Sequence, residues 1–237
     1  DAAQTIRISV ERVSALRREG QSRTDLREAI LAVKRFQAWR FTQTYAAELR
    51  AGPFRDAAQF FLEELYSEKD YTLRDEQFAR IAGALQTLFP HQVVETAVTL
   101  AKLHALTEEL DSAMGKVWLT LGAFGSLGES ERYARAWRMV GRRNDRESQL
   151  RSVLAVGHEL EQLTRTPGLR MMLKLMRRPA KAAGLSALQQ FLERGFDTFA
   201  AMSQSRQSKG AAEFLTMVNT RETALLDRLY SQDFPEF

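Results

Sequence analysis

The chain contains no cysteine, which excludes disulfides, thiolate metal sites and cysteine nucleophiles. It also has no run of about 18 apolar residues, the length that a membrane-spanning helix needs, and no signal-peptide pattern. We therefore expect a soluble, cytoplasmic protein. The first residue is Asp1, which suggests a processing point or the boundary of a longer sequence. A chain of 237 residues can bury a substantial core without disulfides or metal.

Period-two alternation of apolar and polar residues, the mark of a half-buried strand, is never sustained along the chain. Helical spacing recurs instead, and it is longest where Val93, Leu100, Leu103, Leu110, Met114, Val117 and Leu121 follow a three-four alternation. The sequence predicts an all-α fold of about ten helices and no sheet. It predicts one helix over 169–178 and one domain over 1–237, with a subdomain seam at 122–128. That seam reads GAFGSLG and matches no phosphate-binding loop.

The highest apolar density lies in residues 54–66, FRDAAQFFLEELY. Wound at about 100° per residue, this segment forms one apolar arc that includes Phe60 and Phe61. Glu63 falls on the opposite, polar side. Glu64 falls between Phe60 and Phe61, so the element that buries the arc is expected to bury a carboxylate with it.

A buried carboxylate needs a cation or a hydrogen-bond donor, because an unpaired buried charge is too costly to keep. Guanidinium suits this role best, so an arginine is the predicted partner of Glu64. The candidates are Arg74, which is near in sequence, and Arg142 and Arg143, which end a later helix. His104 and a metal ion rank behind them.

Residues 60–66 spell FFLEELY, and the chain resembles the bacterial proteins known as FFLEELY motif proteins. The resemblance covers roughly residues 54 to 200 and extends to four further segments: Arg74-Asp75, 104–111 (HALTEELD), 136–142 (AWRMVGR) and 184–196 (GLSALQQFLERGF). That family is known by its motif and not by an activity, so the resemblance implies no catalytic or binding residue.

Charge is uneven along the chain. Residues 132–181 contain 13 Lys or Arg and 4 Asp or Glu, a net charge of +9, while the remainder has −5. Such a block suits nucleic acid, an anionic membrane, an acidic partner or a solvated helix face. Few aromatic residues are interleaved with it, which argues against nucleic acid. The candidate surface for a ligand or an anionic membrane consists of Met171, Met172, Lys174, Met176, Arg177 and Arg178.

His104, Glu108 and Asp111 are spaced i, i+4, i+7, which stacks them on one helical stripe. Such a stripe can supply nitrogen and oxygen ligands to iron, manganese or zinc. Helical di-metal sites, however, use Glu-x-x-His pairs, and the chain contains none. No cofactor is predicted. No serine lies in a nucleophile elbow.

Two function classes follow. The sequence favours a non-enzymatic helical module that binds a protein partner or an apolar ligand, because it combines aromatic arcs with adaptable methionines and lacks catalytic motifs. The alternative is a metal- or cofactor-dependent enzyme that uses Glu64 and the His104 stripe. A further alternative is peripheral binding to an anionic membrane through residues 132–181.

Overall fold

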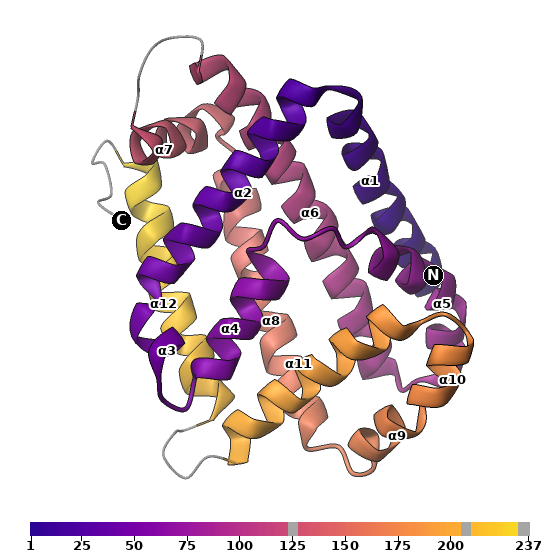
Figure 1. Ribbon diagram of the computed structural model, residues 1–237. Helices are drawn as coiled ribbons and strands as arrows, with labels where there is room; N and C mark the ends of the chain where they lie inside the picture. Colours follow the sequence, from indigo (N-terminus) through magenta and orange to yellow (C-terminus); the bar gives the residue numbers. More distant parts are fainter. Residues whose placement is uncertain (123–127, 205–209, 232–237) are drawn as a thin grey trace.

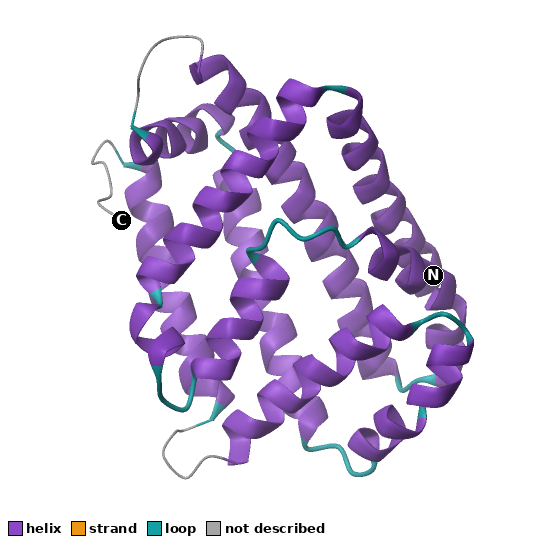
Figure 2. Ribbon diagram, in the orientation of Figure 1, coloured by secondary structure: helices purple, strands orange, loops and turns teal. Residues whose placement is uncertain are grey.

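The computed structural model describes residues 1–122, 128–204 and 210–231, and every regular element within these ranges is an α-helix (Figures 1 and 2). The predicted all-α class is confirmed. The elements are α1 (Ala2–Ser22), α2 (Thr24–Thr44), α3 (Ala46–Arg50), α4 (Arg55–Leu65), α5 (Thr72–Leu88), α6 (His91–Gly122), α7 (Glu129–Val140), α8 (Arg143–Thr164), α9 (Leu169–Leu175), α10 (Arg177–Ala182), α11 (Ser186–Gln204) and α12 (Ala211–Tyr230).

The single helix predicted over 169–178 is wrong, because α9 and α10 are separate helices that meet at Met176. Pro179 explains the break. A proline has no N–H to donate to the carbonyl four residues earlier. The helical hydrogen bond to the Leu175 carbonyl therefore cannot form, and the helix is interrupted there. The proline is tolerated in the first turn of α10, where such a donor is not needed.

The predicted seam at 122–128 falls mostly on residues 123–127, which lie outside the described ranges. On either side of it, α6 ends at Gly122 and α7 begins at Glu129. These two helices pack against each other.

The helices form two layers. In Figure 1, α2, α4 and α11 lie nearer the viewer, and α6 and α8 run behind them. Helix α11 crosses the lower part of the view and packs on α8, α4 and α5. The 32-residue α6 packs against α1, α2, α7 and α8, so it is the central element of the rear layer.

Three groups of buried apolar residues hold the layers together. One joins α2, α6, α7 and α12 around Phe36, Trp118 and Leu229. A second joins α2, α4, α11 and α12, and it buries the apolar arc of α4, where Phe61 meets Phe214 edge-on with ring centroids 5.2 Å apart. A third joins α1, α5 and α6. Among the described helices, none is both long and apolar enough to cross a bilayer.

Candidate functional site

The two helix layers do not close completely, and a cavity of about 430 Å³ lies between them. This volume is within the range of about 300–1,000 Å³ that is typical of small-molecule sites. Helices of both layers contribute to its wall. The wall residues differ sharply in polarity from one end of the cavity to the other.

We call one group of wall residues the polar end. It consists of Gln37, Arg40, Glu64, Arg74, Asp75, His104, Thr107, Asp111, Arg146, Gln149 and Glu222. The other end of the cavity, which we call the apolar end, includes Phe78, Ile81, Val93, Ala97, Leu100, Val153, Val156, Leu160, Leu163 and Met172.

Helices α6 and α8 define the axis between the two ends, because they run antiparallel along the cavity. Gln149 donates to Thr107 at 2.8 Å beside the polar end. Near the other end, Gln92 donates to Glu159 at 2.8 Å. Arg146 and Leu163 thus mark opposite ends of the same wall, about 25 Å apart at the rise of an α-helix.

Glu64 lies at the edge of the polar end, with its side chain 12% exposed. Its Oε2 is 2.8 Å from Nη1 of Arg74, and its Oε1 is 3.4 Å from Nη1 of Arg194. Arg194, on α11, was not among the predicted partners. Arg74 also lies over the rings of Tyr71 and Phe191, at 4.0 and 4.6 Å from their centroids.

The other three predicted partners of Glu64 lie elsewhere. Arg142 pairs with Asp145 and Glu109, and Arg143 pairs with Glu147 and Asp227. These two arginines lie at the start of α8, and the carboxylates named above neutralise their charge in place of Glu64.

His104 faces a different carboxylate. Its Nε2 is 2.9 Å from Oδ2 of Asp75, and Arg17 Nη1 is 2.8 Å from the same oxygen. Burial opposes charge on Asp75, but the His104 hydrogen bond and the charges of Arg17 and Arg74 outweigh it, so the pKa of Asp75 is lowered. Asp75 is therefore a stable anion at neutral pH.

The His104 stripe does not converge on a metal position. Glu108 accepts from Lys34 at 2.8 Å, and Asp111 accepts from Gln37 at 3.1 Å, with Lys34 at 3.8 Å. Within the described ranges, no group of three His, Cys, Asp or Glu side chains is placed to hold a metal ion. Its members instead pair with residues of neighbouring helices: His104 with Asp75, and Glu108 and Asp111 with Lys34.

The buried Arg40 is neutralised by Glu222. Its Nη1 lies 2.7 Å from Glu222 Oε1, which also accepts from the Tyr45 hydroxyl at 3.0 Å. Burial opposes the charge of Arg40, but Glu222 more than compensates and the pKa of Arg40 is raised. Arg40 Nε nonetheless has no protein acceptor among the described residues.

Arg146 is about as buried as Arg40, with 5% of its surface exposed. It differs because no carboxylate oxygen among the described residues lies within 4.0 Å of it. Its Nη1 donates to Gln149 at 3.2 Å, and its guanidinium lies 4.2 Å from the ring centroid of Trp137. Its Nη2 has no described acceptor. Burial lowers the pKa of Arg146, with Tyr133 and Asp111 acting against that effect from a greater distance.

The residues of the predicted ligand or membrane surface do not share one face of the protein. Met171 and Leu175 point outward, with 61% and 69% of their surface exposed. Met172 and Met176 line the cavity. Lys174, Arg177 and Arg178 are exposed on the outside.

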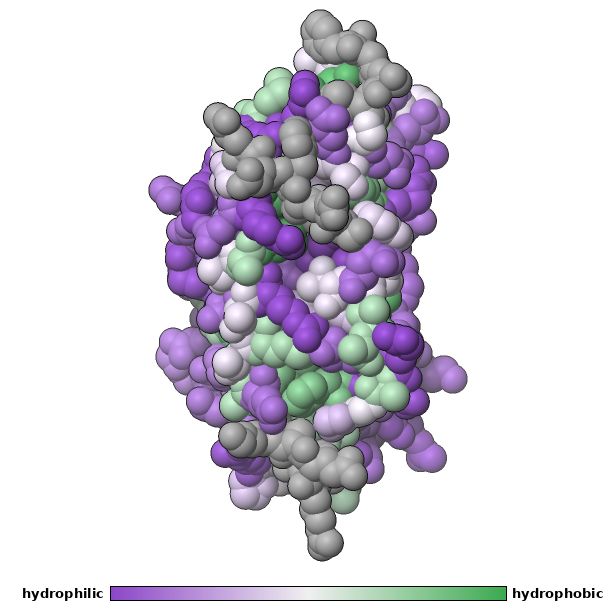
Figure 3. Space-filling view, turned by 90° about the vertical axis from the view of Figure 1, so that its left-hand side faces the viewer, coloured by the Kyte–Doolittle hydropathy of each residue, from purple (hydrophilic) through white to green (hydrophobic). Residues whose placement is uncertain are grey.

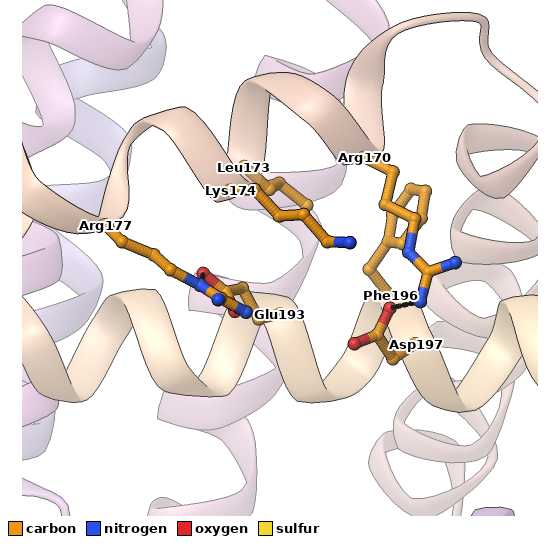
Figure 4. Close-up of a pocket in the computed structure, with 7 residues that line it drawn as sticks. All are labelled: Arg170, Leu173, Lys174, Arg177, Glu193, Phe196 and Asp197. Carbon is orange, nitrogen blue, oxygen red and sulfur yellow. Dashed lines mark hydrogen bonds and ion pairs between the residues drawn. The ribbon is translucent and has the colours of Figure 1, made fainter.

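Ion pairs fasten α9 and α10 to α11 beside this wall. Arg177 binds Glu193 through Nε at 2.8 Å, and Arg170 binds Asp197 at 2.9 Å (Figure 4). The hollow between them measures about 10 Å³, which is enough for about one water molecule. It is therefore part of the fastening and is too small for an organic ligand.

Most of the basic block at 132–181 is likewise engaged within the protein. Ion pairs occupy Arg135, Arg142, Arg143, Arg165, Arg170 and Arg177. Arg132 donates to the Trp118 carbonyl, and Arg138 donates to carbonyls at the end of α12. Arg135 and Arg165 pair within their own helices, whereas the other six arginines connect this block to neighbouring helices.

The face formed by α3 and α12 is mixed in character. Figure 3 shows hydrophilic residues around its margins and hydrophobic residues in its lower half, at the level of α3. A second apolar surface is the inner one, along the cavity wall.

Sequence reasoning missed Arg40, Arg146, Glu222 and Arg194. Two of them do have a signal. Arg40 lies four residues after Phe36 and seven after Val33, on the buried stripe of α2, and Arg146 lies four residues before Leu150 and seven before Val153, on the cavity side of α8. Charges on an apolar helical stripe are the same conflict that singled out Glu64.

Together the fold and this cavity define an all-α protein with a small-molecule-sized internal site. A family model described as "Domain of unknown function (DUF8198)" matches residues 16–235. The chain belongs to this family. Neither the search of curated proteins nor that of solved structures returned a match.

Proposed function

We propose that this protein is a non-enzymatic binding module that holds an apolar small molecule in the cavity between its helix layers. The observation that supports it is the cavity itself, about 430 Å³ in volume and apolar over most of its length. Protein cores are normally packed without voids much larger than a water molecule. A cavity of this size with Leu, Val and Phe walls is suited to a hydrocarbon occupant.

An internal site favours a small ligand over the alternative of a protein partner. The extended apolar surface faces inward, between α5, α6 and α8, which makes it more accessible to a small molecule than to a folded partner. The two polar groups at the apolar end are already bonded. Thr96 donates to the Gln92 carbonyl at 2.9 Å, and Gln189 donates to the Leu173 carbonyl at 2.6 Å.

The proposal is tested by titrating the purified protein with the neutral fluorescent probe N-phenyl-1-naphthylamine. We expect saturable binding near one probe per chain. Leu100→Trp, which fills the apolar end, should abolish it. Leu73→Trp, the same change at an exposed position of α5, should leave binding unchanged. Absence of saturable binding to the unaltered protein, or equal binding by both variants, would contradict the proposal.

We propose peripheral contact with an anionic membrane as a second candidate function. It is supported by the outward-facing Met171 and Leu175, which lie beside Lys174 and Arg178 on the outer side of the cavity wall. Co-sedimentation with anionic vesicles should be salt-sensitive. Leu175→Gln should weaken it, and Ile8→Gln, an exposed apolar change on α1, should not. Equal sedimentation with neutral vesicles would rule out this candidate.

We also propose that the chain is one of the bacterial FFLEELY motif proteins and is cytoplasmic. The FFLEELY letters at 60–66 support the family, and the absence of a run of about 18 apolar residues supports the location. Detection of the native protein in the cytosolic fraction of a source cell tests the location.

A further inference from the structure

We infer that the ligand of this cavity is an anionic amphiphile with a single acyl chain, whose acidic head contacts Arg146 and Arg40 while the chain lies along the apolar end. This inference rests on the proposed function and specifies the chemical class of the ligand. Its basis is a pair of unused guanidinium donors at the polar end, one of them on Arg146, which has no carboxylate oxygen within 4.0 Å among the described residues.

Both guanidinium groups have an unused donor inside the protein. Arg40 Nε and Arg146 Nη2 are fully buried atoms without an acceptor among the described residues. The two side chains belong to opposite layers, on α2 and α8, yet both line this cavity. The head group of a bound ligand would therefore find an unused donor on each of these two helices.

The charge of Arg146 points to an anion and not only to a neutral acceptor. Gln149 and the Trp137 ring are its described close partners, and neither supplies a negative charge. An uncompensated buried charge is strongly destabilising. A water molecule could take up the unused hydrogen bond of Nη2, but it would leave the charge unbalanced.

The nearby carboxylates are committed elsewhere. Glu222 is bound by Arg40 and Tyr45, and Asp75 is bound by Arg17 and His104. Asp111 accepts from Gln37 and shares Lys34 with Glu108, and it acts on Arg146 only from beyond 4.0 Å. Burial raises the pKa of Asp111, which weakens this distant compensation. Guanidinium matches the geometry of carboxylate and phosphate oxygens, so an acidic head group completes the site.

The shape of the cavity selects the rest of the ligand. The wall along α8 changes from Arg146 and Gln149 to Val153, Val156 and Leu163 over about 25 Å. One leaflet of a bilayer, half of its hydrocarbon core, is about 15 Å deep. The cavity is therefore long enough for one acyl chain of ordinary membrane length, and its volume suits a single chain.

The decisive experiment compares three ligands that share a 16-carbon chain, by displacement of N-phenyl-1-naphthylamine from the unaltered protein. These are hexadecanoate, hexadecyl phosphate and the neutral methyl hexadecanoate. We expect at least one of the anions to bind about tenfold or more tightly than the ester, as expected for a charge-assisted hydrogen bond. The stronger anion identifies the head group as carboxylate or phosphate.

Arg146→Met removes the charge and keeps most of the side-chain volume, so it should abolish the preference for the anion and preserve ester binding. Arg146→Lys should restore part of the preference. Arg151→Met, an exposed change on the same helix, is the matched control. If ester and anions compete equally in the unaltered protein, the inference is wrong and the proposed function stands. If none of the three displaces the bound probe, the inference is wrong as well, whereas the proposed function fails only if the probe itself does not bind saturably.

Discussion

At the scale of single residues, this protein keeps several charges inside an apolar wall, and their partners decide whether each is tolerated. Glu64 pairs with Arg74 at 2.8 Å and Arg194 at 3.4 Å. Neighbouring Glu63 pairs with Arg194 at 2.5 Å but is more exposed. The adjacent carboxylates therefore differ mainly in solvation, which makes them a matched pair for mutation.

Glu64→Ala should lower the free energy of unfolding by about 2 to 3 kcal/mol, because the largely buried Arg74 then keeps Asp75, at 3.8 Å, as its nearest carboxylate. Glu63→Ala should cost less than about 1 kcal/mol, as for other exposed ion pairs. Urea unfolding curves of both variants provide the measurement. Losses of equal size would mean that burial does not distinguish the two positions.

Asp75 makes the free energy of unfolding depend on pH in the acidic range. Its pKa is lowered in the folded protein, because the His104 hydrogen bond and two arginines outweigh burial. The resulting stability is fully present above the unfolded pKa of about 3.9 and is lost as the pH falls through the folded value. Asp75→Asn should be less stable than the parent at neutral pH by about 1 to 3 kcal/mol.

Below about pH 4 that difference should shrink, because the parent then also loses the charge. Unfolding measured from neutral to strongly acidic pH checks this dependence. A constant difference between Asp75→Asn and the parent across the range would show that Asp75 stays ionised or that its pair contributes nothing.

At the scale of helices, close approach of α2 and α6 depends on one missing side chain. A Cβ added at Gly115 would lie 2.5 Å from Ile30 Cγ1 and 3.2 Å from the Ile30 backbone nitrogen. The backbone cannot move aside as a side-chain tip can. Only glycine permits this contact without separating the helices.

Gly115→Ala should therefore destabilise the protein by about 1 to 3 kcal/mol, the usual cost of overpacking. Gly20→Ala is the control, since its Cβ would meet Ile30 Cδ1 at an ordinary 3.6 Å. That change should be neutral or stabilising by up to about 1 kcal/mol through helix propensity. Thermal unfolding of both variants tests the contact, and a stable Gly115→Ala would show that α2 and α6 can separate freely.

The sequence was sufficient for most of the helices and insufficient for the cavity, and the reasons are physical. Apolar spacing predicts which face of α4 or α6 is buried, since burial depends on the helix period. It does not report whether opposing faces meet tightly or leave a space. Pairings such as Glu64 with Arg194 depend on how α11 crosses α4, which local pattern does not encode.

Partial signals were nevertheless present at the polar end. Arg40 and Arg146 interrupt the apolar stripes of α2 and α8 in the way that Glu64 interrupts that of α4. Buried charge within a stripe predicts a polar site between helices. Which charges would be paired, and which left for a ligand, depended on distances that only the folded structure provides.

At the scale of the whole molecule, the cavity joins the two sides of the predicted seam. Its wall combines α2, α4, α5 and α6, which precede residue 122, with α7, α8, α11 and α12, which follow residue 128. A ligand bound in the cavity would contact helices from both parts of the chain at once. We therefore propose that residues 1–237 form a single domain whose stability is coupled to occupancy.

A ligand that binds only the folded state stabilises it by about 2.7 kcal/mol at a concentration 100 times its dissociation constant. We expect one cooperative calorimetric transition, which hexadecanoate at that concentration shifts upward as a whole, because the ligand contacts helices on both sides of the seam. Leu100→Trp, with the apolar end filled, should also unfold in one transition but show no shift. Two transitions, with only one shifted by the ligand, would mean that the chain divides near residues 122–128 and that the cavity belongs to one part alone.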